Sequence, residues 1–196
     1  MADKFHAGEH AALTETRVSG EAVYDGVLLH VRRDTVRLPD GRAAVREYIE
    51  HPGAVTILPI LDSGELLMER QYRYPVGREL FELPAGKIDP GEATVETAKR
   101  ELLEETGYVA REWRRLTTFH PAVGYSTEHI ELWLARGLAH RGRTLDDGEF
   151  LETLPVALGT ALEWVRDGRI SDAKTIVGVF WAEKIADRAW PPDSPW

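Results

Sequence analysis

The segment Leu83–Tyr108 constrains this chain most, because it predicts a short loop followed by a strongly acidic helix. The helical pattern covers Thr94–Thr106, and Gly107 stands where the backbone must become left-handed to end the helix. The apolar residues of the helix fall on one side and are expected to pack inward. They are Val95, Ala98 and Leu102.

Three carboxylates lie side by side on this helix. At about 100° per residue, Glu101, Glu104 and Glu105 occupy one face, directly beside the apolar stripe. A solvated acidic face is the simplest interpretation, but part of this face is forced towards the protein interior. Because like charges so close together repel one another, a divalent cation with oxygen ligands would stabilise them. The pattern therefore indicates a metal site.

The fixed positions of the segment follow a characteristic spacing. They are Gly86, Glu92, Arg100-Glu101-Leu102, Glu104-Glu105 and Gly107-Tyr108. This pattern resembles the Nudix box, with Tyr108 in the closing position, which is usually aliphatic. The resemblance implies an α/β (α+β) fold, an α/β/α sandwich with a mixed sheet. It also implies an enzyme that hydrolyses a nucleoside diphosphate linked to another group.

The resemblance also implies roles for individual residues. Glu101, Glu105 and the carbonyl of Ala85 would bind Mg²⁺, with Mn²⁺ as an alternative, and Glu104 would join them or hold a water molecule. Arg100 and Glu92 are further catalytic candidates. For these two, an ion pair that locks the loop against the helix is the alternative to a direct catalytic role.

Residues 17–190 resemble the ADP-ribose (ADP-sugar) pyrophosphatases of the family. Four features carry this resemblance: an N-terminal β segment before the box, and three motifs. The motifs are Arg70–Pro75 followed by Glu82–Gly86, the loop Phe119–Ser126, and the acidic loop Asp146–Glu152. Val123 departs from the pattern, because the group often has proline directly before Gly124. The departure leaves room for nucleotide sugars other than ADP-ribose.

Three positions in these motifs and in the β segment are expected to bind substrate. Arg73 would bind phosphate in a fork, or would form a structural ion pair. Arg46 would stack on the adenine, or would be an ordinary exposed strand arginine. Gly124 lies in the loop after the box.

A carboxylate of the acidic loop is expected to act on the attacking water. We expect Glu149 to orient or deprotonate that water as a catalytic residue. Asp147 and Glu152 are the alternatives in the same loop.

The chain divides by pattern into four parts. We expect a flexible leader over 1–16, the β segment over 17–50, a Nudix hydrolase domain over 51–190 and a tail over 191–196. The residue pattern of the β segment predicts two or three antiparallel strands, with a hairpin turn at Pro39–Gly41. It is too short to bury a core alone, and in the resembling group it is exchanged across a homodimer and helps build the substrate site.

Further elements are predicted in the hydrolase domain. A buried strand over Ala54–Leu61 turns at 62–64 into a returning strand over 65–73, and later strands follow at 79–84 and 127–138. Two helices, about 156–167 and 172–188, end the domain.

The composition of the chain limits the partners and the compartment that we expect. The 24 Lys and Arg against 33 Asp and Glu give a net charge of −9, which argues against nucleic acid as a partner. There is no apolar run of about 20 residues for a membrane span. The chain has no cysteine, which fits a reducing compartment, and we expect a cytoplasmic enzyme.

We therefore predict hydrolysis of ADP-ribose, or of a related nucleoside diphosphate sugar, to AMP (NMP) and a sugar phosphate. A pyrophosphatase for GDP-mannose or other nucleotide sugars is the main alternative. A hydrolase that removes damaged nucleoside triphosphates and a non-catalytic, ligand-sensing Nudix module are more remote alternatives.

Overall fold

The computed structural model describes residues 12–142, 148 and 150–190. These residues form two compact units. The first is the N-terminal unit, residues 12–51 with Ala122–Glu128; the second, the hydrolase unit, is Pro52–Pro121 with the described residues from His129 onwards. None of the helices in the described part of the chain is both long and apolar enough to cross a membrane.

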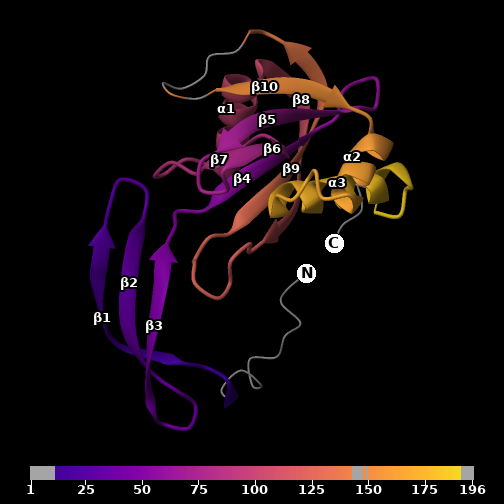
Figure 1. Cartoon of the computed structure of the whole chain (residues 1–196). Helices are drawn as coiled ribbons and strands as arrows, with labels where there is room; N and C mark the ends of the chain where they lie inside the picture. Colours follow the sequence, from indigo (N-terminus) through magenta and orange to yellow (C-terminus); the bar gives the residue numbers. More distant parts are fainter. Residues whose placement is uncertain (1–11, 143–147, 149, 191–196) are drawn as a thin grey trace. The chain divides into compact units, whose positions relative to one another are not determined.

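The N-terminal unit is a three-stranded antiparallel sheet in the order β1-β2-β3 (Figure 1). The strands are β1 Thr16–Asp25, β2 His30–Arg37 and β3 Ala43–Glu50. In the second hairpin, Leu38 N–H donates to the Arg42 carbonyl over 2.8 Å, and Gly41 has φ 87°. The antiparallel strands and the turn at Pro39–Gly41 are as the sequence predicts, because Gly41 adopts the left-handed backbone without strain.

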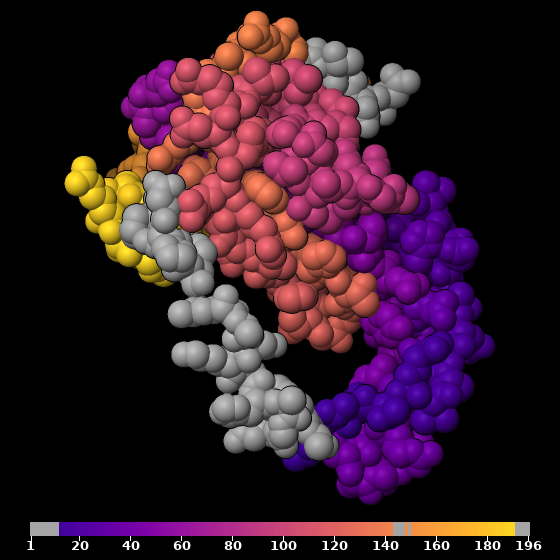
Figure 2. Space-filling view, turned by 180° about the vertical axis from the view of Figure 1, so that it is seen from behind, coloured from indigo at the N-terminus to yellow at the C-terminus, as the bar shows by residue number. Residues whose placement is uncertain are grey.

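This sheet buries very little of itself. In the described part of the unit, only Asp34 and Val36 are buried. The exposed apolar residues on the strands and in the first hairpin are Val18, Val23, Tyr24, Val27, Leu28, Leu29 and Val45. In the space-filling view the sheet is the indigo to violet part of the surface (Figure 2). Such a sheet has no hydrophobic core of its own, as its length implied.

The hydrolase unit is built on a mixed four-stranded sheet in the order β7-β4-β9-β8. The strands are β4 Ala54–Pro59, β7 Ala85–Lys87, β8 Tyr108–Phe119 and β9 Ile130–His140. β4 runs parallel to β9, and the other neighbours are antiparallel.

Helices cover both faces of this sheet (Figure 1). They are α1 Thr94–Thr106, α2 Leu158–Arg166 and α3 Ala173–Ala186. Because side chains alternate along a strand, Val55 and Ile57 of β4 pack with Leu102 of α1, whereas Leu58 belongs to the core beneath α2 and α3. The expected α/β/α sandwich with a mixed sheet is confirmed.

A second, antiparallel sheet has the order β10-β5-β6. Its strands are β5 Leu66–Arg73, β6 Arg78–Glu82 and β10 Leu151–Val156. The strand expected over 65–73 is present as β5, but it does not form a hairpin with β4. Apart from an isolated bridge between Ile60 and Leu66, β5 pairs with β6 and β10 instead. Leu66, Leu67 and Met68 are buried in this position.

Candidate active site

α1 carries the acidic face of the site. Because Ala98 and Leu102 are fully buried against the sheet, the neighbouring carboxylates are drawn inwards. Glu105 is only 5% exposed, and the side chains of Glu101 and Glu104 are 13% and 33% exposed. The carboxylates therefore border the apolar stripe, as the helical wheel predicts.

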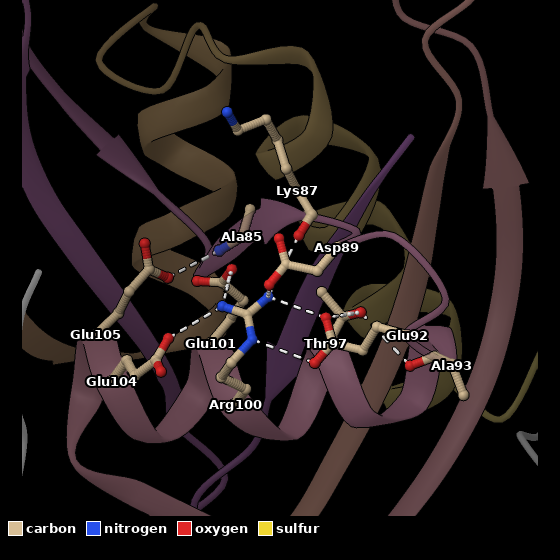
Figure 3. A network of polar contacts seen from close by, with 10 residues as sticks. All are labelled: Ala85, Lys87, Asp89, Glu92, Ala93, Thr97, Arg100, Glu101, Glu104 and Glu105. Carbon is tan, nitrogen blue, oxygen red and sulfur yellow. Dashed lines mark hydrogen bonds and ion pairs between the residues drawn. The ribbon is translucent and has the colours of Figure 1, made fainter. Parts of the chain in front are cut away.

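Glu101 and Glu105 both lie against the start of β7 (Figure 3). The Ala85 N–H donates to Glu105 Oε2 over 3.0 Å. A Cβ added to Gly86 would stand 1.8 Å from Glu101 Oε1, so only glycine lets this carboxylate approach the backbone so closely. The structure thus brings together the three residues expected to bind metal.

Arg100 links the loop to the helix (Figure 3). Its Nη1 donates to Glu101 Oε1 over 2.7 Å and to Glu104 Oε2 over 3.0 Å. Its Nε and Nη2 donate to the two oxygens of Glu92 over 3.2 and 3.1 Å. The ion pair between Arg100 and Glu92 that the sequence analysis set against a catalytic role is therefore present, and Arg100 also binds the helix glutamates.

Hydrogen bonds between Arg100 and Glu92 keep both side chains charged. Bonds to Glu92 raise the pKa of Arg100 despite partial burial, and Glu101 adds to the effect. The same bonds from Arg100 lower the pKa of Glu92, which also accepts from Thr97 Oγ1 over 2.8 Å. Arg100 therefore stays cationic and Glu92 anionic.

The donor set suits a hard divalent cation. It offers carboxylate oxygens of Glu101, Glu104 and Glu105 and backbone at Ala85, the ligand types that Mg²⁺ prefers. Within residues 12–142, 148 and 150–190, no three acidic or histidine side chains form a ready metal cage. The Arg100 guanidinium binds two of the carboxylates, which shows that they converge on a positive charge.

Arg73 forms a two-pronged ion pair with Glu82, with Nε–Oε1 and Nη2–Oε2 both 2.8 Å. The hydrogen bonds that Arg73 donates to Glu82 raise the pKa of Arg73. This is the structural ion pair that the sequence analysis set against a phosphate-binding role. The substrate role stays a prediction, because the pair uses only two of the three guanidinium nitrogens.

Arg46 and Gly124 both belong to the N-terminal unit. Arg46 Nε donates to Glu15 Oε2 over 2.9 Å, and its side chain is about half exposed. Gly124 is exposed, with nothing within 4 Å of a Cβ placed there. Their roles in substrate binding stay predictions.

Two of the three acidic-loop candidates, Glu149 and Asp147, lie outside the described residues. Glu152 is described, in β10, where its carboxylate accepts from Arg70 Nη2 over 2.6 Å and remains largely exposed. Glu152 is therefore paired at the surface, and its role as an alternative catalytic carboxylate stays a prediction.

Sequence reasoning missed a buried charge cluster. Glu82 contacts Lys174 of α3 as well as Arg73, and Lys174 also donates to Asp172 over 2.8 Å. In the sequence, Glu82 stands out only as part of a motif, and Lys174 resembles any helix lysine. The available signal was the placement of Glu82 directly before the loop that leads to Gly86.

The arrangement is that of a metal-assisted hydrolase, and comparison with known families gives its class. The model of the NUDIX domain matches residues 50–172, so the chain belongs to the NUDIX family of hydrolases. A second model, the nucleoside diphosphate sugar hydrolase N-terminal domain, matches residues 15–49. Enzymes of this family generally require a divalent metal.

Individual relatives cover nearly the whole chain. An ADP-ribose pyrophosphatase of Bacillus subtilis is 38% identical over 88% of this chain and 94% of its own length. An ADP-ribose pyrophosphatase of Mycobacterium tuberculosis is 44% identical over 91% and 89%. A crystal structure of an ADP compounds hydrolase superimposes with a TM-score of 0.79 at 25% identity, over 90% of this chain and 96% of the other.

Proposed function

We propose that this NUDIX hydrolase splits the pyrophosphate bond of ADP-ribose, or of a related nucleoside diphosphate sugar, into AMP (NMP) and a sugar phosphate. The observation that carries the proposal is the convergence of Glu101 and Glu105 on Ala85–Gly86. The ADP-ribose pyrophosphatases that cover most of the chain support the substrate.

The metal we propose is Mg²⁺, with Mn²⁺ as the alternative. A bound divalent cation would offset the charge of the two phosphates and lower the pKa of water. Glu101, Glu105 and the carbonyl of Ala85 would hold it, and Glu104 would join them or orient water. Arg100 holds Glu101 and Glu104 in place through Nη1, and Glu92 anchors the other side of the guanidinium.

A substrate panel tests the proposal. The purified protein is incubated with ADP-ribose, ADP-glucose, GDP-mannose, FAD, NADH and diadenosine polyphosphates, with Mg²⁺ or with EDTA. We expect the highest kcat/KM for ADP-ribose and no turnover in EDTA. Equal turnover with and without metal would contradict the metal assignment, and hydrolysis of none of these compounds would contradict the function.

The second candidate is a pyrophosphatase with a preference for GDP-mannose or another nucleotide sugar. Val123 favours it, since proline often fills this position in the ADP-ribose group, and the N-terminal model describes nucleoside diphosphate sugars in general. A kcat/KM for GDP-mannose above that for ADP-ribose would establish it. A non-catalytic sensor is a weaker alternative, because the box carboxylates are all present. A triphosphate hydrolase is also weaker, because the chain carries the N-terminal β segment, which such enzymes often lack.

We also propose that the enzyme is a homodimer, as the exposed apolar sheet of the N-terminal unit favours. Its location in the cytoplasm stays a prediction from the sequence.

A further inference from the structure

The beginning of α3 hydrogen-bonds to and packs against the segment that leads from β6 into the site. Asp172 caps the helix by accepting from the Thr175 N–H over 3.1 Å. Thr175 Oγ1 in turn accepts from the Leu83 N–H over 2.8 Å, and a Cβ at Gly178 would stand 2.2 Å from Leu83 Cδ1. α3 therefore packs closely against Leu83, which directly follows β6 and lies two residues before Ala85.

Lys174, also at the beginning of α3, reaches Glu82, the last residue of β6. Lys174 is buried, and the Glu82 side chain is only 2% exposed. Burial raises the pKa of Glu82, but hydrogen bonds from Arg73 and the charge of Lys174 outweigh burial, so the net pKa is lowered. Glu82 is thus an anion held between two cations, Arg73 and Lys174.

Arg73 is the exposed end of this chain of contacts. Its side chain is 41% exposed, and its Nε and Nη2 bind Glu82, which leaves Nη1 for another acceptor. The charge of Glu105 contributes to the raised pKa of Arg73, after the larger effect of its bonds to Glu82. Glu82, which Arg73 binds, ends β6 three residues before Ala85, whose N–H donates to Glu105 Oε2 over 3.0 Å, so Arg73 is attached to the strand end that leads into the metal site.

We propose that Lys174 is a positioning residue, which fixes Glu82 so that Glu82 holds Arg73 ready to bind a phosphate of the substrate. The inference deepens the proposed function and rests on it, because it needs an anionic diphosphate as substrate. Arg73 touches the phosphate, whereas Lys174 and Glu82 act only through Arg73.

The charges of the cluster explain why Lys174 is needed. Arg73 and Lys174 balance Glu82 and Asp172, giving two cations and two anions. Without Lys174 the cluster carries one net negative charge beside the expected phosphate position. Arg73 is then the only cation for a buried carboxylate, and its attraction for a phosphate is weaker.

Kinetics of Lys174→Met test the proposal. We expect KM for ADP-ribose to rise about 10-fold while kcat changes less than about 3-fold, since the lost interaction serves binding. Lys174→Arg keeps the positive charge and should restore a KM near that of the wild type. Lys184→Met is the matched control, because Lys184 lies on the same helix but pairs with Glu183 at the surface.

A double-mutant cycle with Arg73→Gln separates positioning from a general loss of structure. If Lys174 acts through Arg73, Lys174→Met should not raise KM further in the Arg73→Gln background. Additive increases in KM would overturn the proposal, as would a lowered melting temperature with unchanged KM. An unchanged KM in Arg73→Gln alone would overturn it too.

Glu82→Gln is the second variant, in case Lys174→Met does not fold. It keeps the shape of the side chain and leaves Lys174 paired with Asp172. Glu82→Gln should also raise KM when Arg73 is present, but not in the Arg73→Gln background. An unchanged KM in Glu82→Gln alone would contradict the proposal. If the wild type hydrolyses nucleoside diphosphate sugars and the variants keep its KM, the positioning role alone is refuted. If the wild type hydrolyses no nucleoside diphosphate sugar, the proposed function is refuted.

Discussion

At the scale of single residues, the site depends on how closely α1 approaches β7. Glu105 accepts a backbone hydrogen bond from Ala85, and Glu101 occupies the space that a side chain at Gly86 would fill. Glu105 is therefore oriented by a backbone hydrogen bond, and Glu101 by close packing against the backbone at Gly86. Arg100 adds a third restraint by binding Glu101 and Glu104 through one nitrogen. Preorganised charge of this kind favours catalysis, because little reorganisation is needed when the substrate binds.

Glu105→Gln should lower kcat at least about 10²-fold, in the range found when a key electrostatic group is removed. The amide oxygen can still accept from Ala85, so the fold should persist while the charge is lost. Steady-state hydrolysis of ADP-ribose with Mg²⁺ measures the effect, and circular dichroism checks the fold. Glu112→Gln, at an exposed position of β8, is the control. Near-normal turnover of Glu105→Gln would contradict its assignment as a ligand.

Gly86→Ala should displace the Glu101 carboxylate, because the new methyl group would stand 1.8 Å from Oε1. A misplacement of about 1 Å lowers rates by about 10²-fold, so we expect a loss of this order in kcat and weaker Mn²⁺ binding by electron paramagnetic resonance. Gly159→Ala in α2 is the control, since nothing lies within 4 Å of a Cβ there. If Gly86→Ala binds Mn²⁺ as tightly as the wild type, the close packing has no role in the metal site.

At the scale of elements, the contribution of each helix and strand depends on what it packs against. α1 has the same bounds in the structure as in the sequence prediction, because Gly107 ends it with φ 76° and its N–H donates to the Leu103 carbonyl. β8 and β10 were not predicted. β8 contains three arginines, and β10 contains Pro155, which usually argues against a strand. Both lie at sheet edges, where such residues are tolerated.

The acidic loop, Asp146–Glu152, gives a prediction at this scale. Glu149→Gln should lower kcat by about 10²-fold, the contribution of a general base, with little change in KM. Its pH profile should also lose the acidic limb. Glu152→Gln is the control, because the structure pairs Glu152 with Arg70 at the surface. Impairment of Glu152→Gln instead would show that the loop match is out of register. If neither variant is impaired, box carboxylates and metal alone activate the water.

At the scale of the whole molecule, the N-terminal sheet is the part that cannot be stable alone. Its apolar residues are largely exposed, and only Asp34 and Val36 are buried in the described part of the unit. Exposed apolar surface of this kind is typical of an interface. The Arg17 and Tyr48 side chains hydrogen-bond to Asp34 and so link the three strands, but they do not replace a hydrophobic core.

We expect a homodimer in solution, measured by light scattering coupled to size-exclusion chromatography. Deletion of residues 1–50 should give a poorly soluble or inactive protein, because it removes the apolar sheet that the dimer would bury. Val45→Glu in the full chain is a milder test, since it places a charge on an exposed apolar position and should weaken the dimer. A stable, fully active monomer of the wild-type chain would contradict this prediction.

The sequence by itself determined α1, its row of carboxylates and the hairpin at Pro39–Gly41. These features depend on residues close together in the chain, through helical periodicity and the conformational freedom of Gly41 and Gly107. The same local spacing also carried the family resemblance, which the NUDIX domain match confirms.

Only the tertiary structure decided which sheet β5 joins and which partners the buried charges find. Glu82 and Lys174 lie 92 residues apart in sequence, and nothing near either residue indicates the other. Their contact exists because Gly178 and Thr175 fit α3 against Leu83, which brings the end of β6 and the start of α3 together. Once both charges are buried, pairing is imposed by the cost of leaving either without an opposite charge. That cost arises only when the chain has folded.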